Sequence, residues 1–330
     1  MNGVTSSIAD EHPDLAAAAR GDEQAFRRLT DPHRGALHLH CYRMLGSVHD
    51  ADDALQETLL RAWRSLDRFE PRAPVAAWLH AIATNVCLTT LAGRRRRPEV
   101  PVPDAGEDAW SGTLLHLQPY PDRLLDSVEE RETVELAFIT AAQLLPPKQR
   151  AVLILRDVLD WSAKETAEVL GDSVAAVNSA LQRARAGLER GRRIAAPRHA
   201  PTDDAEERLL LRRFMEAWEA VDVDGIVSLL ARDALMTMPP EPFHARGAET
   251  VGRFFRTVPL NGRLDLIRLV PTAANRQPAL AAYAWDEQAG GHRAYGVMLF
   301  ALEGDEVAGI VGFADASLFG RFGLGAMLEG

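Results

Sequence analysis

The residues from Ser162 to Leu188 have the types and the spacing of a unit that reads DNA. Ser162 followed by Glu165 forms a capping box, which predicts a helix that begins there and ends at Gly171. The buried positions of a second helix, capped by Ser173, are predicted to be Val174, Val177, Leu181, Ala184 and Leu188. Two helices joined at a glycine form a helix-turn-helix.

The outward face of the second helix carries short or hydrogen-bonding side chains near its start and cations further along. These residues are Ala175, Ala176, Asn178, Ser179, Gln182, Arg183 and Arg185. Amide side chains pair with base edges in the major groove, and arginines hold phosphates. An ordinary helical hairpin has the same spacing, so the pattern by itself leaves both interpretations open.

The charge layout points to a polyanion that is contacted at two places. The net charge is −10, yet residues 61–98 hold eight Lys and Arg against two acids, and residues 176–200 hold six against one. Between these basic segments, residues 99–135 hold ten acids and two arginines. A protein that simply coats nucleic acid would be basic along its length.

Composition excludes several classes of protein. With 330 residues, 47% of them hydrophobic, the chain can bury the cores of two or three domains. It has no uninterrupted run of about 18 apolar residues and no signal peptide at its start, so we expect a cytoplasmic protein without a membrane partner. Of His38, His40 and Cys41, only His38 and Cys41 share a helix face, which predicts no metal site, and we expect no cofactor.

Periodicity divides the chain into blocks. Helical spacing fills residues 14–97 and 127–195, and a Pro-, Gly- and acid-rich linker fills 98–126. Residues 203–330 open with helices and continue with alternating apolar runs at 234–239, 264–270, 279–285, 295–302 and 307–315. These runs predict an α+β domain with a largely antiparallel sheet.

Two of these blocks carry a resemblance to a known family. SAKETAEVLGDSVAAVNSALQRARAGLE resembles the promoter-reading helix-turn-helix of extracytoplasmic-function (ECF) sigma factors. DADDALQETLLRAWRSLDRF resembles their polymerase-binding helix, and WLHAIATNVCLTTLAGRRRR resembles the helix that recognises and opens the minus-ten element. The resemblance covers most of residues 14–192 and implies two all-α domains, sigma region 2 at 14–97 and sigma region 4 at 127–195.

The resemblance implies two partners, core RNA polymerase and promoter DNA. The polymerase-binding residues would be Asp50, Asp52, Asp53, Gln56 and Glu57. Acids at a helix start are also favoured by the helix dipole alone, so a solvated helix end is the alternative. In the minus-35 module the resemblance adds Lys164 to the outward-facing residues named above.

In the minus-ten module the resemblance implies contacts from Trp78, Thr84, Asn85, Arg94, Arg95 and Arg96. Trp78, Thr84 and Asn85 would capture a base extruded from the non-template strand, and the arginines would neutralise phosphates. Trp78 also fits a place in the core, and cations also suit a helix C-terminus. Asn85 is a poor helix former, which favours the functional interpretation.

The third block resembles the SnoaL-like, ketosteroid-isomerase-like cone fold. The resemblance rests on ERLLLRRFMEAWEAVDVDGIVSLL, on the later strands and on the tail FADASLFGRFGL. His244 and Asp315 are the candidates for a ligand pocket, although Asp315 at a strand end also suits a capping role. We expect a regulatory domain, not an enzyme, that docks on the basic sigma core. The alternative is a small-molecule sensor, or a cyclase- or isomerase-type enzyme, fused to a sigma-like core.

Overall fold

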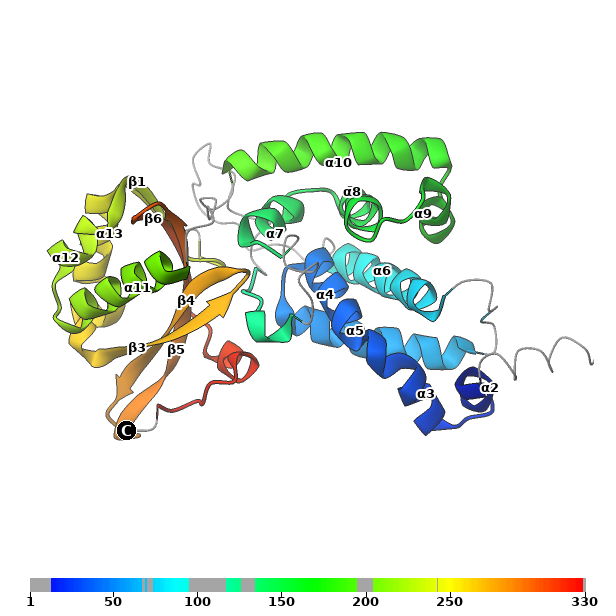
Figure 1. Ribbon diagram of the computed structural model, residues 1–330, viewed down its shortest axis with the longest axis horizontal. Coiled ribbons are helices and arrows are strands. Elements are labelled where there is room, and N and C mark those ends of the chain that lie inside the picture. Colours follow the sequence, from blue (N-terminus) through cyan, green and yellow to red (C-terminus); the bar gives the residue numbers. More distant parts are fainter. Residues whose placement is uncertain are drawn as a thin grey trace, which may run out of the picture. The chain divides into compact units, whose positions relative to one another are not determined.

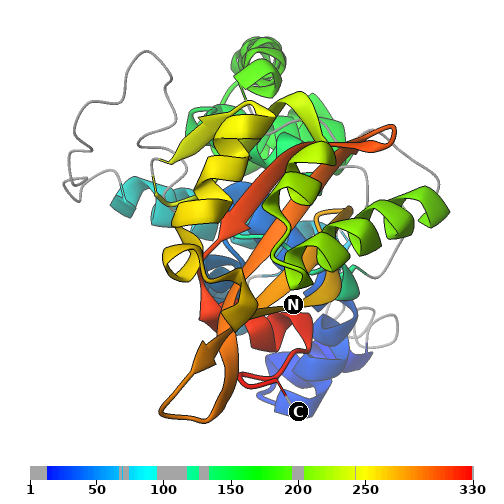
Figure 2. The same ribbon diagram turned by 90° about the vertical axis from the view of Figure 1, so that its left-hand side faces the viewer.

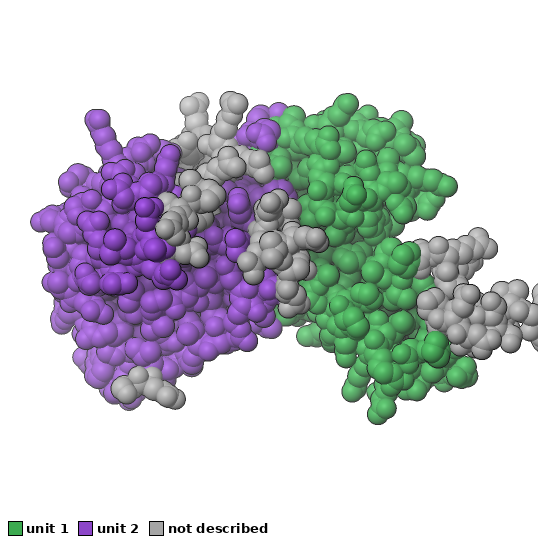
Figure 3. Space-filling view, viewed as in Figure 1, with its two compact units in different colours: residues 1–99, 145–188 green, residues 100–144, 189–330 purple. Residues whose placement is uncertain are grey.

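The computed structural model describes residues 13–66, 69, 74–94, 117–125, 134–194, 204–241 and 243–328. The chain divides into two compact units (Figure 3). Unit 1 comprises residues 1–99 and 145–188, and unit 2 comprises residues 100–144 and 189–330. Unit 1 thus joins the first predicted helical block to most of the second, and each unit is described by itself.

Unit 1 is all helical, as predicted for both sigma-like blocks. Its elements are α2 (Pro13–Ala19), α3 (Glu23–Thr30), η1 (Asp31–His33), α4 (Arg34–Leu45), α5 (Val48–Ser65), α6 (Val75–Arg94), α8 (Pro147–Leu153), η4 (Ile154–Val158), α9 (Ala163–Leu170) and most of α10 (Val174–Ile194) (Figure 1). The first of these helices form a bundle in which α4, α5 and α6 contact one another.

Helix α4 is the centre of this bundle because every residue from Leu37 to Leu45 is buried. A helix that is buried on all sides needs neighbours on all sides, and α5 and α6 supply them. The chain turns between α4 and α5 at Gly46, whose φ of 74° suits a residue without a side chain. Ser47 then caps α5 by accepting a hydrogen bond from the Asp50 amide at 3.1 Å.

Helix α6 passes the length and composition test for a membrane-spanning helix, but 39% of that window is buried inside the structure. Leu79, Ala83, Cys87 and Leu91 form its buried face. The same face contacts α4 and α5, so α6 has the environment of a core helix. Both cysteines, Cys41 and Cys87, are free and buried here.

The predicted helix-turn-helix is confirmed in its boundaries. Both arms of the capping box form, because the Ser162 hydroxyl accepts from the Glu165 amide at 3.2 Å and the Glu165 carboxylate accepts from the Ser162 amide at 2.7 Å. Helix α9 ends at Gly171, whose φ is 63°, and α10 follows. Within unit 1, α6 contacts both α8 and α9.

Unit 2 contains a mixed six-stranded sheet with the order β2-β1-β6-β5-β4-β3. The strands are β1 (Leu230–Thr237), β2 (His244–Arg246), β3 (Ile267–Ala274), β4 (Gln277–Asp286), β5 (Gly291–Glu303) and β6 (Glu306–Phe313). Only the β1 and β6 pair is parallel, so the predicted largely antiparallel sheet is confirmed. Strand β2 was not predicted, because three residues carry too short an alternation.

Helices cover one face of this sheet (Figure 2). The helices and turns of unit 2 are α7 (Leu136–Gln143), α11 (Asp204–Glu219), α12 (Val223–Ser228), α13 (Ala248–Thr257), η3 (Asp122–Leu124), η5 (Pro259–Gly262), η6 (Leu264–Leu266) and η7 (Ala316–Phe322). Aromatic pairs in the core join α11 to the sheet and to α13. Phe214 meets Phe300 edge to face at 5.0 Å, and Trp218 meets Phe255 at 5.5 Å.

Residues 117–125 belong to the linker that was predicted to have no fold. In the structure they dock on the turn between β3 and β4. Asn275, buried in this turn with a φ of 52°, accepts from the Tyr120 amide at 2.7 Å and donates to the Val134 carbonyl at 2.6 Å. Its own amide donates to the Tyr120 carbonyl at 2.9 Å. Pro121 forms a bridge to Ala274. The described end of the linker is therefore part of unit 2.

Candidate nucleic-acid interface

Helix α10 presents the predicted reading face to solvent. All seven outward-facing residues are exposed: Ala175, Ala176, Asn178, Ser179, Gln182, Arg183 and Arg185. Val177, Leu181, Ala184 and Leu188 are buried on the opposite side, as expected. Val174 is 44% exposed, so its assignment to the buried stripe is wrong; it is the first residue of α10.

Two cations near this face differ in their surroundings. Lys164 on α9 is exposed. Arg185 makes a bidentate pair with Asp157, with distances of 2.9 and 2.7 Å from Nε and Nη2 to the carboxylate oxygens. These hydrogen bonds raise the pKa of the Arg185 guanidinium, and they fix its fork on the rim of the reading face. A phosphate would have to compete with Asp157 for Arg185.

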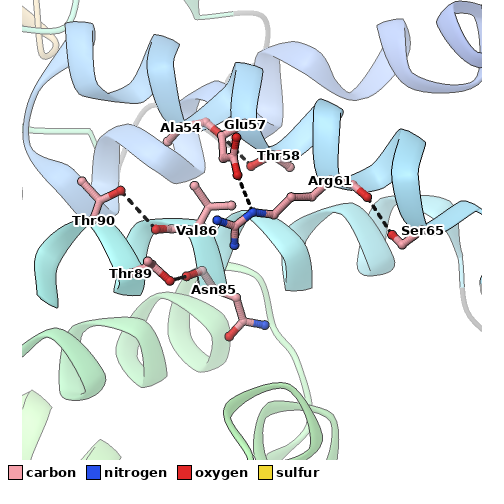
Figure 4. A network of polar contacts seen from close by, with 9 residues as sticks. All are labelled: Ala54, Glu57, Thr58, Arg61, Ser65, Asn85, Val86, Thr89 and Thr90. Atoms are coloured by element: carbon pink, nitrogen blue, oxygen red, sulfur yellow. Dashed lines mark hydrogen bonds and ion pairs between the residues drawn. The ribbon is translucent and has the colours of Figure 1, made fainter. Parts of the chain in front are cut away.

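On α6 the structure separates two adjacent residues that were predicted to act together. Asn85 is exposed, and Figure 4 shows its amide on the side of α6 turned away from Glu57 and Arg61 of α5. Thr84 is fully buried; its hydroxyl donates to the His80 carbonyl at 2.8 Å and lies 2.9 Å from the His40 Nε2. Thr84 therefore does not present its side chain to a base in this structure. Successive helix residues point about 100° apart, which the resemblance could not resolve.

Trp78 lies in a small apolar cluster. Its ring packs against Phe69 with the centroids 4.8 Å apart, and it borders a group of buried residues that includes Leu15 and Leu66. The side chain is half-buried, so part of its surface remains accessible. This surrounding favours the core interpretation stated for Trp78 above.

Arg94, at the end of α6, pairs with Asp50 of α5 and donates to the Leu45 carbonyl at 3.4 Å. A predicted phosphate contact and a predicted polymerase contact therefore neutralise each other. Arg95 and Arg96 lie outside the described residues.

The other predicted polymerase-binding residues of α5 fall into two groups. Asp52 lies 3.3 Å from His38, and Glu57 accepts from Arg61 at 2.6 Å (Figure 4). Asp53 and Gln56 are exposed. The exposed pair is thus the part of the predicted polymerase-binding set that faces solvent without an ion pair among the described residues.

Sequence reasoning missed a buried arginine that joins the two sigma-like blocks inside unit 1. Arg150 of α8 is 3% exposed; it donates to the Met44 carbonyl of α4 at 2.5 Å and to the Leu145 carbonyl at 3.2 Å. A buried cation needs several acceptors, and these carbonyls supply them. Every residue has a backbone carbonyl, so the sequence contains no signal that points to this contact.

The two buried histidines that contact Thr84 have lowered pKa values. His40 and His80 stack edge to face at 5.3 Å. Burial lowers the pKa of His40 well below 6.5, with further lowering by His80 and Arg43. Burial also lowers the pKa of His80, partly opposed by its hydrogen bond with the Ala76 carbonyl. These rings join α4 to α6 and so position the helix that carries Asn85.

The candidate pocket residues of the α+β domain lie on different elements. His244 is exposed on β2, and Asp315 caps η7 by accepting from the Ser317 amide at 3.0 Å. A cavity in this domain is lined by other residues, and the ligand pocket at His244 and Asp315 stays a prediction. Among the described residues, no group of three or more His, Cys, Asp and Glu is arranged to hold a metal ion.

Family models match three segments of the chain. Residues 29–97 match Sigma-70 region 2, and residues 135–188 match Sigma-70 region 4. Residues 211–310 match a SnoaL-like domain. The three matches lie in the order that the sequence predicted.

Similar proteins include the ECF RNA polymerase sigma factor SigG of Mycobacterium tuberculosis, 42% identical over 319 residues, which are 92% of this chain and 84% of SigG. SigW of Bacillus subtilis is 30% identical over 176 residues, 52% of this chain and 90% of SigW. The crystal structure of Mycobacterium tuberculosis SigJ matches with a TM-score of 0.61 and 25% identity, covering 89% of this chain and 98% of SigJ. The chain therefore belongs to the ECF RNA polymerase sigma factors, which direct RNA polymerase to promoters, and it carries a SnoaL-like domain after its two sigma regions.

Proposed function

We propose that this sigma factor recognises two promoter elements with separate helices, the minus-ten element through α6 and the minus-35 element through α10. The observation that carries the proposal is the composition of the exposed α10 face. Its first turns bear Asn178 and Gln182, which can read base edges, and Arg183 follows where phosphates would lie. A helix of this kind enters a major groove with its N-terminal residues at the bases.

The minus-ten contact is proposed at Asn85, with Arg94 on phosphate. Asn85 is exposed on α6, and its amide can donate to and accept from a base edge. Arg94 reaches a phosphate only if it exchanges Asp50 for it. Asp53 and Gln56 are exposed on α5 and can bind polymerase without involving Asp50. Their binding therefore does not prevent Arg94 from exchanging Asp50 for a phosphate.

The test is transcription from linear promoter fragments by the full chain with core polymerase. Asn178→Ala and Gln182→Ala should change which minus-35 bases are preferred, while Arg183→Ala should weaken binding on every sequence. Arg253→Ala is the matched control, since Arg253 is exposed on α13 and its substitution removes the same positive charge. Transcription by the Gln182 and Arg183 variants at the parental level and with parental base preference at moderate salt would refute the proposal.

We further propose that the SnoaL-like domain regulates the sigma regions by holding the linker between them. Asn275 bonds to Tyr120 and Val134, which lie on either side of residues 126–133. Arg276 adds a hydrogen bond from its amide to Asp122 at 2.9 Å, and Gln118 donates to Asp315 at 3.1 Å. A linker held at these points is not free to follow a path through polymerase. The docked and released states thus differ in contacts, which regulation of an equilibrium requires.

Asn275→Gly tests this regulation, because glycine keeps the positive φ and removes the side-chain hydrogen bonds. The two lost side-chain hydrogen bonds contribute about 1 kcal/mol each, so transcript output should rise by up to about thirtyfold while start sites stay the same. Asn261→Gly is the control, since Asn261 has a φ of 57° and is exposed away from the linker contacts described above. Parental output from Asn275→Gly would refute regulation through this contact.

A further inference from the structure

Asp157 and Arg185 form an ion pair between two segments of unit 1. Arg185 lies on the outward face of α10, and Asp157 lies 28 residues earlier in η4, the segment that follows α8. Two hydrogen bonds of 2.9 and 2.7 Å join the guanidinium to the two carboxylate oxygens. This bidentate geometry matches the planar guanidinium fork, so the pair orients Arg185 as well as neutralising it.

A π-turn carries Asp157. Residues Ile154–Val158 form a π-helix, in which the Leu159 amide donates to the Ile154 carbonyl at 3.0 Å. Such a turn inserts one residue into the helical repeat, which changes the direction of the side chains, and it is frequent at functional sites. Ile154 and Leu155 are buried, whereas Asp157 is exposed. The turn therefore leaves the Asp157 carboxylate outside the core, where Arg185 of α10 reaches it.

The ion pair lowers the number of cations that this face offers to DNA. Lys164 and Arg183 are exposed and make no ion pair among the described residues. The Arg185 side chain is 61% exposed, but Asp157 neutralises its charge. A phosphate must displace a carboxylate to reach Arg185, and non-specific DNA binding depends on the number of phosphate contacts. Asp157 therefore weakens the binding that depends on charge alone.

We propose that Asp157 is a specificity-determining residue of the minus-35 contact, because it withholds Arg185 from phosphates until α10 contacts the bases. This role rests on the recognition of the minus-35 element by α10 that is proposed above. On a matching element, Asn178 and Gln182 hold α10 in one register, so a phosphate stays beside Arg185 and replaces the carboxylate. On other DNA α10 has no fixed register, and Arg185 stays with Asp157. One phosphate contact is thus added on the matching sequence alone.

The salt dependence of binding measures the number of phosphate contacts. Each contact steepens the plot of log affinity against log salt concentration by about 0.9. The full chain with core polymerase is titrated, by fluorescence anisotropy, against a labelled promoter fragment that it transcribes. The second probe is the same fragment with its minus-35 element scrambled. Core polymerase contributes equally for every variant, so differences in slope report on the substituted residue.

Two substitutions should change the slope on different fragments. Asp157→Asn releases Arg185, so binding to the scrambled fragment should steepen by about 0.9 and tighten by up to about fivefold, while the slope on the promoter fragment stays parental. Arg185→Ala should reduce the slope on the promoter fragment by about 0.9. In the double variant the steepening on the scrambled fragment should disappear, because the released cation is missing. A pair that only stabilises the fold would not divide the two fragments in this way.

Asp160→Asn is the matched control, because Asp160 is an exposed acid close to Asp157 in sequence and makes no ion pair among the described residues. Its φ of 53° suits asparagine, so the substitution removes the same charge without strain. Equal slope changes from Asp160→Asn and Asp157→Asn would show that charge alone is responsible and would overturn the proposal. Circular dichroism checks that each variant folds.

The two fragments also separate this proposal from the recognition on which it rests. Equal parental affinity for the promoter and scrambled fragments would overturn minus-35 recognition, and the role of Asp157 with it. Where the parent discriminates between the fragments, an Asp157→Asn slope that is parental on both, or steeper by the same amount on both, overturns the role of Asp157 alone. Reduced discrimination in Asp157→Asn, with parental discrimination in Asp160→Asn, is the expected result.

Discussion

At the residue scale, the polar groups of α6 divide into one that faces solvent and several that hold the helix in place. Asn85 is exposed, whereas Thr84 and His80 of α6 meet His40 of α4 in the buried interior. Buried polar groups are paired because an unpaired one is costly. The division leaves Asn85 available for the proposed base contact, while Thr84 and His80 hold the helix in place.

Asn85→Ala should weaken binding of the polymerase holoenzyme to a single-stranded minus-ten oligonucleotide by about fivefold to tenfold, the effect of losing amide hydrogen bonds to a base. Fluorescence anisotropy of a labelled oligonucleotide measures it. Thr89→Ala is the control, because Thr89 is exposed one turn away and its hydroxyl bonds to the backbone carbonyl of residue 85. Equal affinities of the two variants would contradict the role of Asn85.

The buried histidines make the stability of the protein depend on pH. Because burial lowers the pKa of His40 and His80 in the folded state, both are neutral there and take up protons on unfolding. The contribution of the two neutral histidines to the free energy of unfolding is complete above a pH of about 6.5. It is lost as the pH falls below this value, by up to about 1.4 kcal/mol per pH unit for each histidine. Arg43 and His33 face these rings and disfavour protonation further.

Urea unfolding between pH 5 and pH 8 should therefore show a fall in stability on the acid side. In His40→Leu the slope below pH 6.5 should be shallower, because one of the two protons is no longer taken up. A slope equal to that of the parent protein would show that His40 is not the group responsible.

At the element scale, the angle between α9 and α10 depends on Gly171. Its φ of 63° is a left-handed conformation, and the capping box at Ser162 fixes the other end of α9. A Cβ at Gly171 meets no atom within 4 Å, so any cost of adding one is conformational. This turn sets how the exposed α10 face is presented.

Gly171→Ala should reduce the free energy of unfolding by about 1 kcal/mol, because a side chain disfavours the left-handed conformation. The opposite sign is expected for Gly93→Ala, which should stabilise α6 by up to about 1 kcal/mol, since Gly93 is helical and also has open space around it. Chemical denaturation of both variants measures the pair. Stabilisation of the protein by Gly171→Ala would contradict the strained turn.

At the scale of the whole molecule, charge is distributed by function. Residues 201–330 hold nineteen acids and twelve bases, whereas the basic segments lie in the sigma regions at 61–98 and 176–200. The SnoaL-like domain therefore adds no affinity for DNA by charge alone. Its proposed influence on transcription passes through the linker contacts at Asn275.

Removal of residues 203–330 should raise transcript output at least as much as Asn275→Gly does, because it also removes the contacts of Arg276 and Asp315 with the linker. The promoters used should stay the same, since α6 and α10 are intact. Mapping of transcript starts together with quantitative runoff transcription checks both statements. A change of promoter choice would place part of the recognition in the removed domain.

The local patterns of the sequence determined the helix-turn-helix, its capping box, the exposed face of α10 and the alternation of the strands. These features could be predicted because periodicity and capping depend on residues within a few positions of one another. The resemblance to ECF sigma factors then indicated both sigma regions and the SnoaL-like domain before any contact was known.

The tertiary structure alone decided which residues meet across long stretches of chain. Thr84 is buried against His40, which lies 44 residues earlier in the chain. Residues 117–125 are held by Asn275, which lies 155 residues after Tyr120. The pairing of Arg94 with Asp50 and the lining of the cavity arose in the same way. A sequence shows which face of an element is apolar, but partner identity depends on how distant elements pack, and no local pattern encodes that.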